Sequence, residues 1–208
     1  MASLSMQTPK RPLATFADLM RIPEERRFHE ILDGHLVQKA LPRLVHGSAQ
    51  GRVAQLLHSF DRKPGGVGRP GGWWLVVEPT VRLSIHQVVQ PDVAGWRRER
   101  LPKLTGDYPI ELRPDWVCEI LSDADARRRD GVDKRRIYAD HGVPHYWLVD
   151  TERETLTVLT LTENGYQETL SATRHDRVHA APFASLLLQV GVLFGEDETE
   201  DQPPAPAP

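Results

Sequence analysis

Three acidic residues lie among apolar neighbours in segments that have the composition of β-strands. Glu119 lies in the run DWVCEILS, Asp92 lies in QPDVAGW, and Glu30 lies in FHEIL. A carboxylate that is ionised inside an apolar strand is costly in free energy unless a cation or hydrogen-bond donors compensate it. The three residues therefore predict either one shared cation or separate structural partners.

A shared site would need a divalent cation. If the three carboxylates lie within ~5 Å of one another, each pair repels by roughly 3 kcal/mol at an effective dielectric constant near 20. Carboxylate oxygens without thiolates suit Mg²⁺ or Mn²⁺ better than zinc, and Mg²⁺ commonly binds carboxylates together with water and substrate phosphates. A phosphodiester is then the expected substrate. The alternative, in which each acid has its own arginine or backbone donor, stays open.

Length and composition favour one domain. The chain has 208 residues and 39% hydrophobic content, which suffices for a single sizeable core. No apolar run approaches the ~18 residues of a membrane span, and the N-terminal dozen residues lack the apolar stretch of a secretory signal. We therefore expect a cytoplasmic protein with no membrane partner. Cys118 is the only cysteine, which excludes an intrachain disulfide and a cysteine-rich zinc module.

The two ends differ in composition from the rest. We expect residues 1–14 to be a flexible N-terminus, 15–194 to be the folded domain and 195–208 to be a disordered acidic and proline-rich tail. That tail carries five acidic residues and no basic ones, which leaves 26 basic and 24 acidic residues in the remainder. A charge near +2 neither requires nor excludes a nucleic-acid partner.

Local signals place Glu30 on a hairpin. Thr15 followed by Asp18 resembles a capping box that begins a short helix. The dipeptide Asp33-Gly34 between two apolar segments predicts a β-hairpin, with Glu30 on its first strand.

The remaining pattern mixes helices and strands. Apolar residues recur at helical spacing from Ser48, and a second helix is expected from about Ala124 to Asp140. We expect a glycine-rich loop over 62–72, strands within 73–78, 80–85, 88–96, 115–122, 145–150 and 155–161, and a short helix within 182–194.

These motifs, taken in order, resemble a known family. They are EILDG at 30–34, His46, QPDV at 90–93, PDWVCEILS at 114–122, the D-x-x-x-K-x-x-x-Y spacing of Asp130, Lys134 and Tyr138, and GVPHYWLVD at 142–150. The set resembles the Uma-two-type restriction endonuclease family, a branch of the PD-(D/E)XK nuclease superfamily. The resemblance extends from about Thr15 to Phe194.

The resemblance implies an α/β fold, a restriction-endonuclease-like mixed central sheet flanked by helices, with an N-terminal helix and β-hairpin. It also implies a metal-dependent endonuclease that hydrolyses DNA. Asp92, Glu119 and the Ile120 carbonyl would bind Mg²⁺ or Mn²⁺, and Glu30 would give direct or water-mediated support. By analogy with nucleases that cut both strands, we expect a homodimer.

One position departs from the wider superfamily. A lysine there stands two residues after the glutamate, on the same strand face, but this chain has Leu121. Lys134 is the candidate replacement, positioning the attacking water and stabilising the transition state. Helical spacing places Asp130, Lys134 and Tyr138 on one face. A solvent-exposed ion pair between Asp130 and Lys134 is the alternative interpretation.

Other functions and sites stay open. Leu121 keeps alive a catalytically silent relative that serves as a nucleic-acid-binding or regulatory module, and a metal-free carboxylate glycosidase is a third hypothesis. Two basic clusters, 127–136 and 97–103, would track phosphates or form solvated faces. His46, just before the helix that contains Val53, has either a site role or a structural one.

Overall fold

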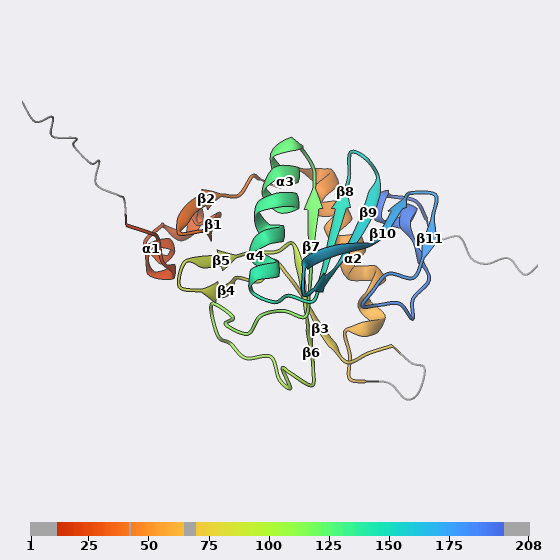
Figure 1. Cartoon of the computed structure of the whole chain (residues 1–208), viewed down its shortest axis with the longest axis horizontal. Coiled ribbons are helices and arrows are strands. Elements are labelled where there is room, and N and C mark those ends of the chain that lie inside the picture. The colour runs from red at the N-terminus through yellow and green to blue at the C-terminus, as the bar shows by residue number, and fades with distance from the viewer. Residues whose placement is uncertain (1–11, 42, 65–69, 198–208) are drawn as a thin grey trace, which may run out of the picture.

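The computed structural model describes residues 12–41, 43–64 and 70–197 of the chain (Figure 1). A six-stranded sheet has the strand order β10-β9-β8-β7-β6-β3, and a four-stranded sheet has the order β2-β1-β5-β4. The strands of the large sheet are β3 (Trp73–Val77), β6 (Val93–Arg97), β7 (Trp116–Leu121), β8 (His145–Asp150), β9 (Thr155–Thr162) and β10 (Gly165–Thr173). Those of the small sheet are β1 (His29–Leu32), β2 (His35–Gln38), β4 (Val81–Ser84) and β5 (Gln87–Val89). A two-stranded ribbon, β11 (Arg177–Val178) with β12 (Leu188–Gln189), and the 3₁₀ helix η4 (Val190–Phe194) follow.

The large sheet is mixed because one of its strand pairs is parallel. β7 and β8 run parallel, whereas the other neighbours in this sheet run antiparallel. A parallel pair needs a crossover, and a helix between residues 124 and 140 provides it. This arrangement confirms the predicted mixed α/β sheet.

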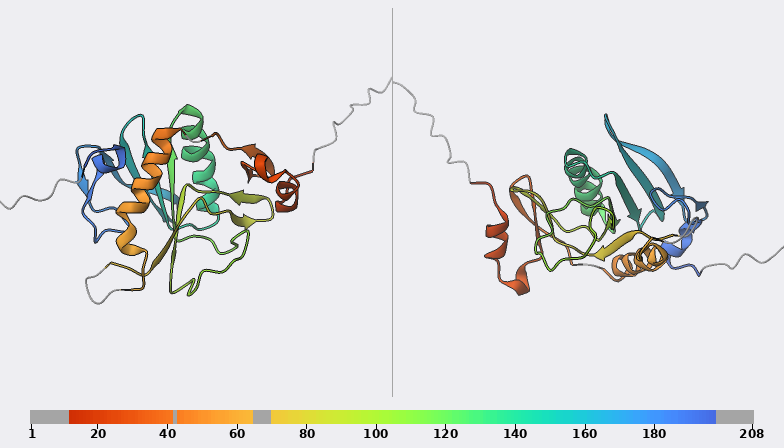
Figure 2. Two further views of the ribbon diagram at one scale, coloured as in Figure 1. Left: turned by 180° about the vertical axis from the view of Figure 1, so that it is seen from behind. Right: turned by 90° about the horizontal axis from the view of Figure 1, so that it is seen from below.

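Helices cover both faces of the large sheet, as Figure 2 shows from two further directions. On one face, α2 (Leu44–Leu56) packs against β7, β3 and β6. The crossover helix covers the other face. Side chains of β7 alternate between these layers, so Cys118 and Ile120 pack in the core cluster that contains α2, whereas Val117 packs with Ile137 of the crossover helix. Glu119 therefore points toward the crossover helix.

The crossover helix contains a π turn. It consists of α3 (Ala124–Arg128), the π-helical segment η3 (Arg129–Lys134) and α4 (Arg135–Asp140). The Asp123 side chain caps its start by accepting a hydrogen bond from the Ala126 amide at 2.8 Å. π turns are rare in proteins and occur often at functional sites.

The small sheet carries the N-terminal elements. α1 (Phe16–Met20) begins with the predicted capping box of Thr15 and Asp18, and the 3₁₀ helix η1 (Glu24–Arg26) leads into β1. The predicted hairpin turn is confirmed, with positive φ angles of 51° at Asp33 and 75° at Gly34. A Cβ at Gly34 would also lie 2.7 Å from Leu13 Cβ, so only glycine fits there.

A three-residue link joins the two sheets and begins the site. β5 of the small sheet ends at Val89, and β6 of the large sheet begins at Val93. β1 pairs with β5 through Ile31 and Val88, which brings Glu30 beside the link. There the Gln90 amide donates a hydrogen bond of 2.7 Å to Glu30 Oε1. Glu30 and Asp92 thus become neighbours although 62 positions separate them in sequence.

Several sequence-based expectations need correction. α2 begins at Leu44, four residues before the predicted Ser48, so His46 lies inside the helix rather than before it. The expected strands belong to two sheets, not one, and β10 was not anticipated. The segment 182–194 holds β12 and a 3₁₀ helix instead of one short helix.

The predicted terminal segments lie mostly outside the described residues. Contacts nevertheless reach slightly past the expected domain bounds, because the Ala14 amide donates to the Gly34 carbonyl and Glu196 pairs with Arg174. Within the described part of the chain, no helix is both long enough and apolar enough to cross a membrane.

A charged cap at the end of β8 gives a testable pH dependence. Asp150 accepts hydrogen bonds from Arg127 and from the backbone amides of Glu152 and Arg153. Burial alone would raise the pKa of Asp150, but these hydrogen bonds outweigh it and lower the pKa below the ordinary value of 3.8. A lowered pKa in the folded state stabilises the protein above the unfolded-state pKa, and this stabilisation is lost as the pH falls through the folded-state pKa.

We expect Asp150→Asn to lower the free energy of unfolding by about 1 kcal/mol at neutral pH. The substitution should have little effect at low pH, where Asp150 is protonated in both the folded and the unfolded state. Urea denaturation of both proteins at neutral pH and at a pH below the lowered folded-state pKa of Asp150 measures the difference. An equal loss at the two pH values would assign the effect to packing and not to the charge of Asp150.

Candidate active site

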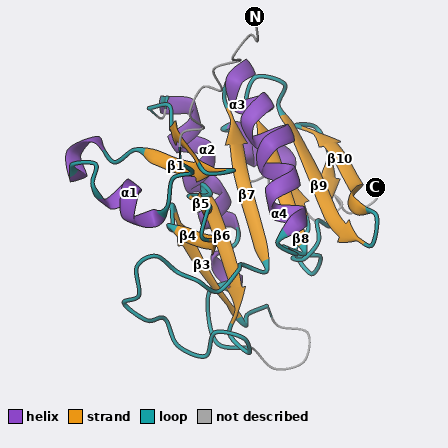
Figure 3. Cartoon of the chain, turned by 60° about the vertical axis from the view of Figure 1, so that its left-hand side comes forward, coloured by secondary structure: helices purple, strands orange, loops and turns teal. Residues whose placement is uncertain are grey.

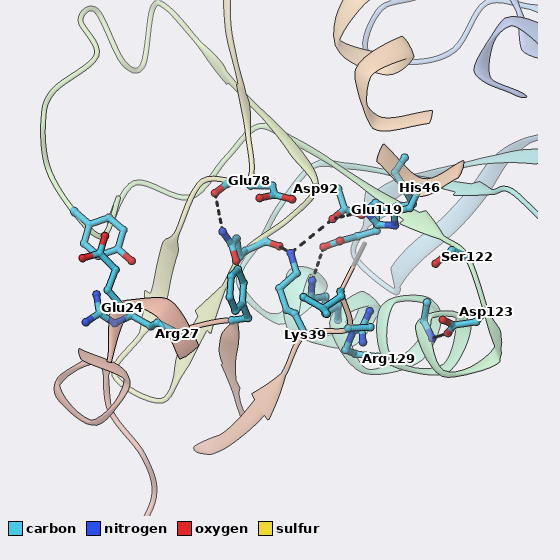
Figure 4. Close-up of a pocket in the computed structure, with 18 of the residues that line it drawn as sticks. Glu24, Arg27, Lys39, His46, Glu78, Asp92, Glu119, Ser122, Asp123 and Arg129 are labelled. Atoms are coloured by element: carbon cyan, nitrogen blue, oxygen red, sulfur yellow. Dashed lines mark hydrogen bonds and ion pairs between the residues drawn. The ribbon is translucent and has the colours of Figure 1, made fainter. Parts of the chain in front are cut away.

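A pocket of about 530 Å³ lies where the link between the sheets meets β7 and the crossover helix. Asp92, Glu119 and Lys134 line it, and the predicted ligand residue Ile120 lines it as well. Glu30 is fully buried beside this group. Figure 4 shows Asp92 and Glu119 with their carboxylates close together inside the pocket, near His46 and Lys39.

Lys134 is the centre of the acidic cluster. Its Nζ lies 2.8 Å from Glu30 Oε1, 2.8 Å from Glu119 Oε1 and 3.5 Å from Asp130 Oδ1. The lysine is only 1% exposed, so the alternative of a solvent-exposed pair with Asp130 is wrong. Lys134 of the crossover helix thus reaches the same face of the sheet as Glu119. In the wider superfamily, a lysine on the strand itself lies on that face.

Glu119 is held from the crossover helix. The Tyr138 hydroxyl donates a hydrogen bond of 2.7 Å to Glu119 Oε1, the same oxygen that Lys134 contacts. The predicted common face of Asp130, Lys134 and Tyr138 is confirmed, since all three side chains are buried toward the sheet.

Asp92 has a separate set of partners. Its Oδ2 accepts a hydrogen bond of 2.7 Å from the Ile120 amide of the neighbouring strand. Its Oδ1 lies 3.3 Å from His46 Nε2 and 3.7 Å from Lys39 Nζ. The Gln50 side chain donates to the Asp92 backbone carbonyl at 2.9 Å, which fixes the end of the link against α2.

The two carboxylates have opposite pKa shifts. Burial would raise the pKa of Asp92, but the hydrogen bond from His46 and the charge of Lys39 lower it to about 2. Burial raises the pKa of Glu119 to about 8, because the nearby Lys134 offsets burial and the neighbouring acids only in part. Burial would also lower the pKa of Lys134, but Glu119, Glu30 and Asp130 raise it above its usual range. At neutral pH Asp92 is therefore anionic and Lys134 cationic.

The donor set fits a hard cation held by few protein ligands. Among the residues that the structure describes, no three His, Cys, Asp or Glu side chains form a ready-made metal cage. Mg²⁺, however, commonly takes one or two carboxylates and completes its shell with water and substrate oxygens. Asp92 and Glu119 supply two such carboxylates in one pocket. In the described part of the chain, Glu30 Oε2 is buried without a hydrogen-bond partner, so this oxygen has lone pairs free for a cation or for water bound to it.

Sequence reasoning missed one residue of the site and misplaced one basic cluster. Lys39 lines the pocket, but it follows β2 without any local motif. Arg129, which belongs to the basic cluster noted over 127–136, also lines the pocket. Arg97 and Arg98 lie at the far end of β6, roughly 15 Å along the strand from Asp92. They stack on Trp73 and Trp74 instead of lining the pocket.

Three tryptophans belong to the hydrophobic core. Trp73, Trp116 and Trp147 are at most 3% exposed, and each lies in contact with Phe183. They are not available for stacking on bases.

Comparisons with known proteins agree with this fold. The family model Uma2, described as "Putative restriction endonuclease", matches residues 16–191. A crystal structure of a protein from Anabaena variabilis ATCC 29413, described as a "putative nuclease belonging to DUF820", superposes with a TM-score of 0.68. It is 25% identical, and the match covers 86% of this chain and 97% of that one. The chain therefore belongs to the Uma2 family of restriction-endonuclease-like proteins.

Proposed function

We propose that the chain is a Mg²⁺- or Mn²⁺-dependent endonuclease that hydrolyses DNA phosphodiester bonds. One observation carries the proposal: carboxylates from β1, β7 and the link between the sheets converge with Lys134 at one pocket. The family match supports a nuclease-like function in general, and the metal and the DNA substrate are our inference.

The metal would be held by Asp92, Glu119 and the Ile120 carbonyl. When bound, a divalent cation polarises the scissile phosphate and makes water more acidic. Glu30 takes a supporting role in this proposal, because it contacts Lys134 at 2.8 Å and shares that lysine with Glu119.

The residues of the chain supply positioning and charge. Lys134 remains cationic and lines the pocket, so its ammonium orients the attacking water and stabilises the negative charge that develops on the phosphate. Tyr138 fixes Glu119 by its hydrogen bond. His46 and Lys39 keep Asp92 ionised.

The partners of the proposed enzyme follow from the sequence analysis. DNA is the substrate, a homodimer is the assembly expected for cutting two strands, and the cytoplasm is the expected location. The alternative of a catalytically silent relative rested on Leu121, which stands where the superfamily has a lysine. In this proposal Lys134, which contacts Glu119, supplies that positive charge instead.

Removal of divalent cations is expected to abolish cleavage. We expect supercoiled plasmid to be nicked or linearised with Mg²⁺ or Mn²⁺ and to stay intact with excess EDTA, with activity returning when the metal is restored. Gel electrophoresis of the plasmid measures the outcome. Cleavage that persists in EDTA would contradict the proposal, as would the absence of cleavage with both metals.

A further inference from the structure

The rim of the active-site pocket is apolar and exposed, unlike its floor. Phe28 is 51% exposed, Tyr108 is 55% and Leu41 is 76%, and all three line the pocket. Asp92 and Glu119 in the same pocket are 3% and 1% exposed. Clustered exposed apolar side chains commonly mark a binding surface. Exposed apolar side chains and buried carboxylates therefore line one and the same pocket.

Arg27, the residue that precedes Phe28 in the sequence, also lines the pocket. The guanidinium of Arg27 donates to the carbonyls of Ile22 and Met20, and it pairs with no carboxylate among the described residues. Figure 4 shows Arg27 and Glu24 at one end of the pocket and Ser122 and Asp123 at the other, with Asp92 and Glu119 between them. The pocket thus offers an elongated path with Arg27 at one end. Glu24 lies at the same end, but it forms no ion pair with Arg27 among the described residues, so the guanidinium can still bind a phosphate.

A regular DNA duplex matches this arrangement poorly. Its phosphates lie on the outside of a stiff helix, and its bases are stacked inside, out of reach of exposed aromatic rings. An unpaired strand can turn a base out of the stack, place it on an aromatic side chain and bring the adjacent phosphate into a pocket. The exposed rings of Phe28 and Tyr108 beside buried carboxylates favour such a substrate.

We propose that this site takes unpaired DNA, such as a single strand or a frayed end, and that Phe28 and Tyr108 hold the base next to the scissile phosphate by stacking. Arg27 binds a neighbouring phosphate of the same strand. The substrate class rests on the proposed nuclease function, whereas the binding itself does not.

Binding without cleavage tests the idea first. A fluorescein-labelled single strand and the duplex of the same sequence are titrated with the protein in EDTA, and fluorescence anisotropy gives both dissociation constants. We expect the single strand to bind about 10-fold more tightly than the duplex. Equal binding, or tighter binding of the duplex, would overturn the proposal.

Variants at Phe28 separate stacking from apolar contact. Phe28→Ala is expected to weaken single-strand binding by about 5- to 100-fold, Phe28→Leu nearly as much, and Phe28→Trp hardly at all. Ile85→Ala is the matched control, since Ile85 is 66% exposed in the β4–β5 turn and is not one of the residues that line the pocket. If leucine binds as well as phenylalanine, the rim is not a stacking platform.

Three further results distinguish failure of this proposal from failure of the proposed nuclease function. If Mn²⁺-dependent cleavage occurs equally on duplex and single strand and Phe28→Ala has no effect, the substrate class is wrong and the nuclease function stands. If Phe28→Ala weakens single-strand binding but no DNA is cut with either metal, the binding proposal stands and the nuclease function fails. Conversion of a dimer to a monomer by Phe28→Ala in sedimentation would instead assign the rim to an interface between copies of the chain, and would overturn the proposal.

Discussion

Changing Glu119 to glutamine is expected to reduce metal-dependent DNA cleavage by at least about 1000-fold, because a metal ligand supplies several kcal/mol of transition-state stabilisation. The amide oxygen can still accept the hydrogen bonds of Tyr138 and Lys134. Since the pKa of Glu119 is about 8, the uncharged side chain resembles the protonated form that prevails at neutral pH without metal. The fold should therefore survive while activity is lost.

Initial rates on plasmid DNA in Mn²⁺ measure this effect, and thermal unfolding without metal checks the fold. Asp92→Asn should lose activity to a similar extent, because its amide oxygen retains the contact with the Ile120 amide but loses the charge. Glu163→Gln, an exposed change in the β9–β10 turn, is the matched control. Undiminished cleavage by the Glu119 or Asp92 variant would remove these residues from the mechanism.

Replacing Lys134 by methionine is expected to lower the free energy of unfolding by about 3–5 kcal/mol, the cost of breaking a buried ion pair on one side. Lys134 is 1% exposed and lies 2.8 Å from both Glu30 and Glu119. Methionine fills much of the lysine volume, so the loss reports the missing charge more than a cavity. Urea denaturation measures the change, and DNA cleavage should disappear in the folded fraction.

Two companion variants isolate the charge of Lys134. Lys103→Met makes the same substitution at an exposed position and should leave the denaturation midpoint unchanged. Glu30→Gln combined with Lys134→Met should be more stable than Lys134→Met alone, because the double change removes one of the carboxylates left without a cation. A Lys134→Met protein as stable as the parent would show that the acids need no cation to remain buried.

Features governed by local chemistry were predictable from the sequence. The Asp33-Gly34 turn needs positive φ at both positions, and few residue types other than Asn, Asp and Gly accept this. The capping box of Thr15 and Asp18 is equally local. The three buried acids were recognisable because ionised groups rarely stand in apolar strands without a reason.

Features that depend on long-range pairing were not predictable in the same way. The division into two sheets follows from the pairing of Ile31 with Val88, which no periodicity in either strand encodes. β10 was missed because this edge strand is mostly polar and half-exposed. The start of α2 was misplaced because Arg43 makes no side-chain cap and Leu44 is 91% exposed, so the first turn lacks both usual signals.

The site shows the same division. Spacing alone placed Asp130, Lys134 and Tyr138 on one face, but it could not tell whether that face meets solvent or the sheet. Burial against the sheet decides this, and Figure 3 shows the crossover helix lying over the large sheet and running alongside β7. Lys39 joins Asp92 only through the folded path of the chain after β2, and its sequence context carried no signal.

The π turn adds one residue to the crossover helix. The α-helical segments before and after it therefore differ in their rotation around the helix axis. α3 keeps Ala126 against the sheet, and α4 keeps Ile137 and Tyr138 inward, each with its own phase around the axis. Lys134 is the last residue of the turn that connects these phases. Removing a single residue there would rotate α4 by about 100° around the helix axis relative to α3. The direction of the Lys134 side chain therefore depends on the exact number of residues in the π turn.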